Sequence, residues 1–229
     1  MNQLPISNAL PEKALLLPGK KIFNFVNLNT VYWFNKNESY KALISKKQNI
    51  NFSDSRIIAL KLGIEQQRGP SFARRFLLSS NAKNKKHFFV GLEKKDLQAL
   101  SSATGISDLR LNAYNPPYIS GLEFSPKEKS KIISLAKKFK PDYIWICVGS
   151  PKQEILANQL FDKFHSNYLN IGAAMDFLLE KKKEAPSLFR VLALEWLFRL
   201  LTDFKKSKIK VWRSFLGLFY SGSIQVPEK

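Results

Sequence analysis

Cysteine is nearly absent from this chain of 229 residues, and the single thiol, Cys147, cannot form an intramolecular disulfide. The sequence also has no charge-free apolar run close to the roughly 20 residues that a membrane-spanning helix needs. Near the N-terminus, a run of three leucines ends at Pro18 and Gly19, so we expect no signal peptide. These absences indicate a globular protein of a reducing compartment, and we expect a cytoplasmic location.

Acidic residues are scarce relative to basic ones. The sequence contains 37 lysines and arginines against 18 aspartates and glutamates, which gives a formal net charge of +19. An excess of this size indicates an anionic partner, such as nucleic acid, an acidic membrane surface or a phosphorylated substrate.

Short runs of apolar, β-branched and aromatic residues alternate with helical patterns along most of the chain. This alternation predicts an α/β fold, Rossmann-like, with a mostly parallel sheet and helices on both faces. We expect a lead-in segment over residues 1–20, an α/β domain over 21–186 and a basic, helical C-terminal appendage over 187–229. The expected strands are 22–27, 50–53, 87–90, 109–112, 143–148 and 168–171. The expected helices are 30–46, 56–62, 72–78, 94–103, 126–139, 151–164, 188–201 and 204–220.

The expected strand 143–148 runs directly into a helix through Gly149. Ser150 can cap that helix, Pro151 suits its first position, and Gln153 stands three residues after Ser150, as a capping box requires. The free N–H groups and the positive dipole end of such a helix attract phosphate. Two interpretations stay open from geometry alone: an ordinary strand-to-helix turn, or a site for a phosphate-bearing ligand.

Four segments, in the same order, carry a resemblance to a known family. They are Asn115-Pro-Pro-Tyr118, Gly149-Ser-Pro-Lys-Gln-Glu154, Asn170-Ile-Gly-Ala-Ala-Met-Asp-Phe177, and Ala185-Pro186 followed by Leu194-Glu-Trp-Leu-Phe-Arg-Leu200. Together they resemble the motifs of the WecG/TagA/CpsF family of bacterial glycosyltransferases, also called family 26. One motif of that family, Arg-Val-x-Gly-x-Asp-Leu, is poorly matched by residues 67–72.

The resemblance implies an activity. We expect an inverting glycosyltransferase that moves an N-acetylmannosamine-type sugar from a UDP donor to a polyprenyl-diphosphate-linked sugar, for cell-envelope polysaccharide or teichoic acid synthesis. The seven aspartates are isolated in the sequence, without the Asp-x-Asp pair that holds a metal in many glycosyltransferases, and the family lacks that pair too. We therefore expect no metal and no other cofactor. The family can be oligomeric, which leaves a homo-oligomer open.

Asp54 is the candidate general base. An inverting transfer needs a group that deprotonates the acceptor hydroxyl. The resemblance assigns this role to an aspartate that follows a short early strand, and Asp54 matches that position. The alternative is an aspartate that caps the helix beginning near Arg56, which the sequence also suits.

The resemblance further implies residues that bind the donor and shape the pocket. Asn27 and Asn29 follow the first strand, and turn formation or capping is the alternative for both. For Gln153 and Glu154, the capping box is the alternative. Pro117 and Tyr118 are expected in the pocket wall on the acceptor side. The donor-binding set is Asn27, Asn29, Gly149, Gln153, Glu154, Gly172, Arg199 and Arg213.

The C-terminal segment interleaves basic and aromatic side chains. It can dock on an anionic membrane, close its arginines over the donor diphosphate, or pack as a plain helix with a solvated lysine face. We expect a location peripheral to the inner face of the cell membrane. The alternative for the whole chain is a basic α/β protein that binds nucleic acid or nucleotides without transferase activity, although the sequence contains no recognised nucleic-acid-binding motif.

Overall fold

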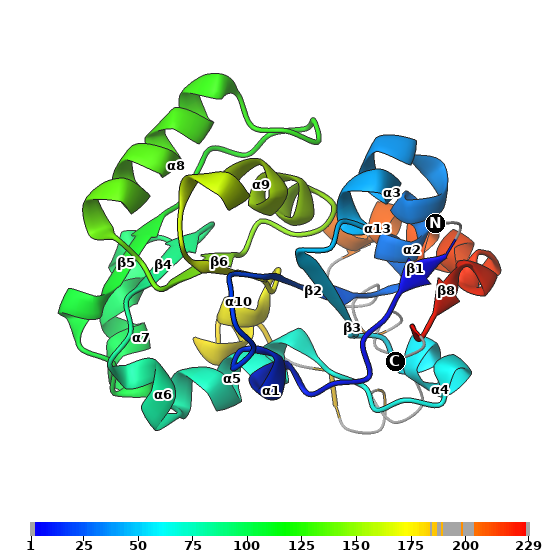
Figure 1. The fold of residues 1–229 in the computed structure, drawn as a ribbon, viewed down its shortest axis with the longest axis horizontal. Coiled ribbons are helices and arrows are strands. Elements are labelled where there is room, and N and C mark those ends of the chain that lie inside the picture. Colours follow the sequence, from blue (N-terminus) through cyan, green and yellow to red (C-terminus); the bar gives the residue numbers. More distant parts are fainter. Residues whose placement is uncertain (1–2, 184, 187–188, 190–197, 199–203, 228–229) are drawn as a thin grey trace.

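A single parallel sheet organises the chain (Figure 1). Every pair of neighbouring strands in it is parallel, so all six carboxyl ends lie at the same edge. The strand order is β3 (Asn49–Ser53), β2 (Ile22–Val26), β7 (Asn167–Asn170), β6 (Tyr143–Ile146), β4 (His87–Val90) and β5 (Leu111–Tyr114). The computed structural model describes residues 3–183, 185–186, 189, 198 and 204–227.

Helices cover both faces of this sheet, as the sequence predicts (Figure 1). One face carries α2 (Leu28–Lys36), α3 (Glu38–Ile44), α8 (Pro126–Phe139) and α9 (Lys152–Leu160). The opposite face carries α1 (Pro11–Ala14), α5 (Gly69–Leu78), α6 (Ser80–Lys83), α7 (Leu97–Thr104) and α10 (Ala174–Leu178). Because both faces are covered, the central strands are buried at nearly every position rather than at alternate positions.

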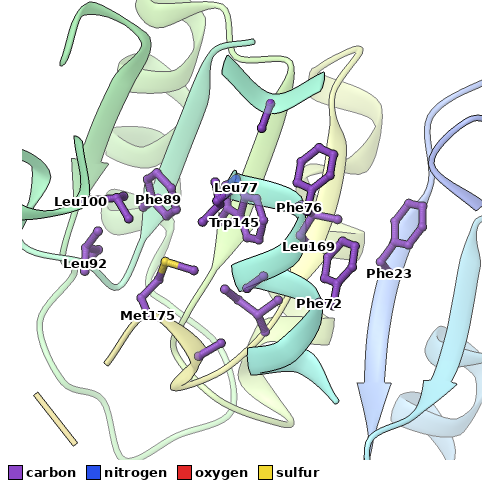
Figure 2. Packing of buried hydrophobic residues seen from close by; sticks show 14 of the residues in the cluster. Phe23, Phe72, Phe76, Leu77, Phe89, Leu92, Leu100, Trp145, Leu169 and Met175 are labelled. Carbon is purple, nitrogen blue, oxygen red and sulfur yellow. The ribbon is translucent and has the colours of Figure 1, made fainter. Parts of the chain in front are cut away.

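Two hydrophobic layers enclose the sheet. Phe23, Phe89 and Trp145 point to the layer beneath α5, where they pack with Phe72 (Figure 2). The residues immediately before them on each strand point to the other layer, beneath α8 and α9. All of these side chains are fully buried, and the aromatic rings of Phe89 and Trp145 stack at 5.7 Å.

The C-terminal residues return to the beginning of the chain. The long helix α13 (Phe204–Phe219) packs along α2, and the two-residue strand β8 (Ile224–Gln225) pairs with β1 (Leu4–Pro5). Gly217 allows the close approach of α13 to α2, because a Cβ at this position would overlap the carbonyl group of Leu28. The division into a lead-in, a domain and an appendage stays a prediction. The expected helix 188–201 lies almost wholly outside the described residues.

The prediction of one helix over residues 30–46 is wrong, because this segment forms two helices, α2 and α3. The side chain of Asn37 accepts a hydrogen bond from the Tyr40 N–H at 2.8 Å and so begins α3 as a separate helix. The first of the two helices begins at Leu28, two residues earlier than expected, and is capped by Asn27. Polar caps inside an otherwise helical pattern override its periodicity.

Other boundaries differ by one turn or less. Residues 108–110 form a 3₁₀ turn instead of the start of a strand, which moves β5 two residues along the chain. The helix expected from residue 72 begins at Gly69, and the helix expected from residue 94 begins with a 3₁₀ turn. Strand β6 ends at Ile146, two residues earlier than expected.

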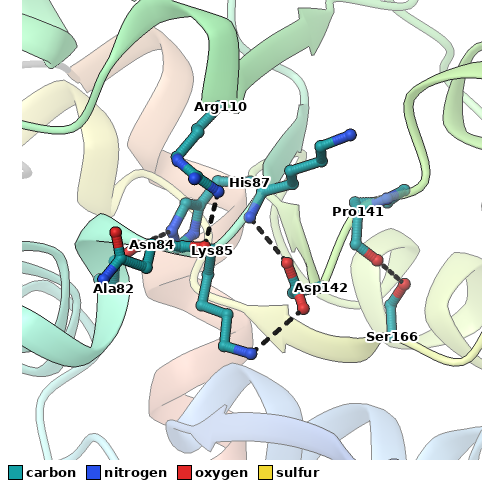
Figure 3. Close-up of polar contacts among 9 residues, drawn as sticks. Ala82, Asn84, Lys85, His87, Arg110, Pro141, Asp142 and Ser166 are labelled. Atoms are coloured by element: carbon teal, nitrogen blue, oxygen red, sulfur yellow. Dashed lines mark hydrogen bonds and ion pairs between the residues drawn. The ribbon is translucent and has the colours of Figure 1, made fainter.

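At the amino ends of β4 and β6, His87 is part of the core. Its Nε2 lies 3.0 Å from the Ala82 carbonyl oxygen (Figure 3). Its Nδ1 accepts a hydrogen bond of 3.0 Å from the indole of Trp145. One nitrogen therefore donates and the other accepts, as in neutral imidazole. Burial lowers the pKa of His87 to about 4. Nearby, Asp142 accepts hydrogen bonds from the Lys86 N–H and the Lys85 ammonium group.

Candidate active site

Four of the predicted site residues, Asn27, Asp54, Gly149 and Gly172, follow strand ends at the carboxyl edge of the sheet. Asn27 and Asp54 follow the adjacent strands β2 and β3, whose last residues, Val26 and Ser53, are paired. Gly149 and Gly172 follow β6 and β7, which are also adjacent. Ligands of open α/β sheets bind at this edge.

Asp54 caps a helix, but not the one that the sequence suggested. Its Oδ1 accepts a hydrogen bond of 2.9 Å from the N–H of Gly69, the first residue of α5. Helix α4 (Arg56–Leu62), which directly follows Asp54, has Ser55 at its cap position and no side-chain cap. The alternative of Asp54 as the cap of α4 is therefore wrong. The N-terminus of α5 instead stabilises the Asp54 carboxylate as an anion.

Arg68 is a further candidate site residue, which the sequence interpretation missed. It is the cap residue of α5, directly before the Gly69 N–H that binds Asp54, and its side chain is half-buried. The segment 67–72 matched the family motif poorly, so the motif comparison gave it no weight. An arginine next to a glycine that begins a helix was the signal that could have found it.

Asn27 and Asn29 differ in what they do. The Oδ1 atom of Asn27 accepts hydrogen bonds from the N–H groups of Asn29 and Thr30, at 3.1 and 3.3 Å, and completes a capping box with Thr30. The capping alternative is therefore realised for Asn27. The side chain of Asn29 is buried, and its Oδ1 has no hydrogen-bond partner in the described part of the chain.

The turn after β6 begins with Gly149, whose φ of 82° favours glycine. Helix α9 then starts at Lys152 with Pro151 as its cap residue. The predicted capping box is wrong, because the Ser150 hydroxyl is buried without a hydrogen bond and the Gln153 side chain is engaged elsewhere. The peptide bond between Ser150 and Pro151 is cis.

Gln153 and Glu154 lie beneath the turn rather than at its surface. Their exposed fractions are 4% and 1%. Gln153 Oε1 accepts a hydrogen bond of 2.9 Å from the Gly172 N–H, and Gln153 Nε2 donates one of 2.9 Å to Glu154 Oε1. Burial raises the pKa of Glu154. The pair thus links the turn after β6 to the turn after β7.

The loop after β5 borders the same turn. Pro117 and Tyr118 are exposed, Tyr118 at 91%. The ammonium group of Lys152 donates a hydrogen bond to the Ile119 carbonyl and lies 4.8 Å from the centre of the Tyr118 ring. Partial burial lowers the pKa of Lys152. Tyr118 is therefore held beside the start of α9.

Helix α13 brings a cation to the Gly149 turn, but not the predicted one. The Nζ atom of Lys210 lies 3.7 Å from the position that a Cβ of Gly149 would take. Arg213 instead lies over the ring of Trp33 on α2, with its guanidinium carbon 4.8 Å from the ring centre. The other predicted arginine, Arg199, lies outside the described residues.

The sequence model of the family described as "Glycosyl transferase WecG/TagA/CpsF family" matches residues 7–221 of this chain. The chain belongs to this family. The match includes the whole six-stranded sheet and all of α13, so the residues at the carboxyl edge lie inside the matched region.

Similar curated proteins come from Staphylococcus aureus. The enzymes named N-acetylglucosaminyldiphosphoundecaprenol N-acetyl-beta-D-mannosaminyltransferase in strains NCTC 8325 and COL are each 36% identical over 80 residues. The enzyme of that name in strain MRSA252 is 35% identical over 80 residues. Each matched stretch is 34% of this chain and 32% of the relative, so the chain spans about a third of the length of these relatives.

Within the described ranges, no group of three or more His, Cys, Asp or Glu side chains could hold a metal ion. The cations and donors near the edge are instead lysines, Arg68 and backbone N–H groups. The metal-independent mechanism stays a prediction.

Proposed function

We propose that this chain transfers an N-acetylmannosamine-type sugar from a UDP donor to a polyprenyl-diphosphate-linked N-acetylglucosamine, with inversion and without a metal. One observation carries the proposal. In a chain of this glycosyltransferase family, the acid Asp54 and a strand-to-helix turn suited to phosphate, at Gly149, lie at the same edge of the sheet. The printed name of the Staphylococcus aureus relatives supports the choice of sugar and acceptor.

The donor diphosphate binds at the Gly149 turn. The proximity of Lys210 Nζ to Gly149 and the positive end of α9 support this assignment, because both stabilise negative charge. When the sugar leaves, charge develops on the diphosphate, and preorganised cations and N–H groups there lower the barrier. Gly172 and the buried Gln153–Glu154 pair shape the floor of this donor site, and Arg199 and Arg213 stay predicted contacts of the diphosphate.

Asp54 accepts the proton of the acceptor hydroxyl. Strands β3 and β6 are separated by β2 and β7, which sets their ends about 14 Å apart at the usual strand spacing. This distance is comparable with the length of a sugar diphosphate, so a donor bound at Gly149 can extend its sugar toward Asp54. Asn27 and Asn29, at the end of the intervening strand β2, line the path of the sugar.

The acceptor is lipid-linked in this proposal, so the protein must reach a membrane surface. On α13, the side chains of Ile209, Trp212, Phe215 and Phe219 are 51–71% exposed, and Lys208 and Lys210 are exposed on the same helix. Such a basic, aromatic helix suits the interface of an anionic membrane. No helix in the described residues is long and apolar enough to cross a bilayer.

A donor screen tests the proposed reaction. The purified chain is incubated with a panel of UDP-sugars and a short-chain lipid-diphosphate N-acetylglucosamine, and released UDP is measured. We expect UDP release with the N-acetylmannosamine donor that depends on the acceptor and persists in a chelator. Binding of nucleic acid with steep salt dependence, together with no binding of UDP, would instead favour the nucleic-acid-binding alternative.

A further inference from the structure

Glu154 is a buried acid, and its side chain is too deeply buried to contact a bound ligand directly. Its side chain is 1% exposed, on the first turn of α9. Its Oε1 accepts the hydrogen bond from Gln153 Nε2, at 2.9 Å. Its Oε2 makes no hydrogen bond with the described residues, although Ser150 and Tyr40 are near enough to affect its pKa. Such a group is costly to bury and needs a reason.

The carboxylate fixes the orientation of the Gln153 amide. An amide side chain has one end that donates and one that accepts. With Nε2 directed to Glu154, Oε1 faces the Gly172 N–H, which donates to it at 2.9 Å. The rotated amide would direct its NH₂ group at the Gly172 N–H, and the two donors would repel each other. Gln153 Nε2 also donates a longer hydrogen bond of 3.4 Å to the Asn170 carbonyl oxygen. Glu154 accepts the shorter of the two bonds and so contributes most to the orientation in which Gln153 can bind Gly172.

The bonded glycine begins the turn after β7. Gly172 has a φ of 55°, and it lies between the end of β7 and α10. Because β6 and β7 are adjacent, the bond joins the two neighbouring turns at the carboxyl edge. Tyr40, from α3, is 2% exposed and close enough to Glu154 for the carboxylate to raise the pKa of its hydroxyl in addition to the effect of burial. Both members of the Gln153–Glu154 pair are themselves almost fully buried, which strengthens the hydrogen bond between them.

We propose that Glu154 is a positioning residue that acts through the Gln153 amide to hold the Gly172 turn beside the Gly149 turn, so that both turns face one bound nucleotide diphosphate. The inference rests on the proposed function for the identity of the ligand. The bond itself can be measured without any ligand.

Amide exchange at Gly172 tests the bond in the whole chain. In Glu154→Leu and in Gln153→Leu, we expect the Gly172 N–H to exchange about tenfold faster by NMR, because its acceptor is lost or free to rotate. Glu154→Gln keeps an acceptor oxygen for Gln153 and recovers most of the protection. Gln159→Leu is the control, since Gln159 lies on α9 but donates to Glu123 at the surface. Unchanged exchange in Gln153→Leu would overturn the inference.

Titration with UDP tests the consequence. We expect Glu154→Leu to weaken UDP binding about tenfold, with Glu154→Gln restoring it and Gln159→Leu leaving it as in the unsubstituted chain. Faster exchange at Gly172 with unchanged UDP affinity would refute the link between the turns and the ligand. If the unsubstituted chain binds no UDP, the proposed function fails, and the exchange rates still decide whether Glu154 orients Gln153. Should Glu154→Leu not fold, Glu154→Gln and Gln153→Leu carry both measurements.

Discussion

At the scale of single residues, the position of Asp54 gives the proposed general base a structural role as well. A hydrogen bond from the first N–H of α5 holds its Oδ1 in place. The same bond and the helix dipole favour the ionised form, which is the form that a general base needs.

Asparagine at position 54 should separate these two roles. The Asn side-chain oxygen still accepts the Gly69 N–H, so we expect Asp54→Asn to fold and to bind UDP. Without a base, turnover should fall by about 10²–10⁴-fold. Sugar transfer and UDP titration measure the two effects, and Asp162→Asn, at an exposed side chain, is the matched control. Undiminished turnover would remove Asp54 from the mechanism.

Because His87 is buried in its neutral form, we predict that the folded chain loses stability in acid. Its pKa is about 4 in the folded chain, below the ordinary value of 6.5, because burial disfavours the charged ring. The stabilisation is therefore present above about pH 6.5 and is lost as the pH falls to about 4. The loss amounts to about 3 kcal/mol at 1.36 kcal/mol for each pH unit.

Denaturant unfolding between pH 7 and pH 4 measures this loss. A glutamine at position 87 can keep one donor and one acceptor without titrating, so we expect the unfolding free energy of His87→Gln to fall by about 3 kcal/mol less over this range. His165→Gln, at an exposed position, is the matched control. Parallel curves for His87→Gln and the unsubstituted chain would show that His87 does not set the acid limit.

At the scale of helices and strands, the elements that the sequence predicted best are those with strong local determinants. Helix α8 has its expected bounds because Ser125 caps it, Pro126 fits its first position, and Lys140 ends it in a left-handed conformation. Strand β4 also has its expected bounds, because its four residues are all buried between two layers of helices.

The details of the candidate site depend on contacts between distant segments, which a local pattern cannot contain. Asp54 binds an N–H that is 15 residues further along the chain, not the nearby helix. Gln153 binds Gly172 instead of capping its own helix. Lys210 reaches Gly149 from a helix in which the sequence analysis expected an arginine, and not this lysine, to contact the donor. The residue types in the sequence therefore indicated which residues belong to the candidate site, but they did not predict which residues each of them contacts.

Helix α13 should be especially sensitive at Gly217. Alanine favours an isolated helix over glycine by up to about 1 kcal/mol, but its Cβ would overlap the Leu28 carbonyl. Overpacking of this kind costs about 1–3 kcal/mol, so we expect Gly217→Ala to detach α13 from α2 in a fraction of the molecules.

Hydrogen exchange along α2 and α13 measures this detachment. We expect faster exchange in both helices and unchanged exchange in the strands of the sheet. Gly222→Ala, at an exposed glycine with open space around it, is the control. If the amides of α13 exchange equally slowly in Gly217→Ala and in the unsubstituted chain, α2 moves to accommodate the added methyl group and α13 stays packed against it.

At the scale of the whole molecule, the net charge of +19 and the exposed face of α13 act on the same partner in the proposed function. Long-range attraction brings a basic protein to an anionic surface, and apolar side chains then retain it there. The rings of Trp212 and Phe215 stack at 5.8 Å, and those of Phe215 and Phe219 meet edge-on at 5.3 Å, which makes one continuous aromatic surface.

Sedimentation with liposomes separates the two contributions. We expect binding to vesicles with anionic lipid, weaker binding as salt rises, and a roughly tenfold loss for each of Trp212→Ser and Phe219→Ser. Leu109→Ser is the control, because Leu109 is 87% exposed but belongs to the turn before β5. Equal losses in Leu109→Ser and Trp212→Ser would mean that general surface hydrophobicity, and not α13, retains the protein. If Trp212→Ser and Phe219→Ser leave vesicle binding unchanged but added salt abolishes it, the membrane contact belongs to the lysines alone.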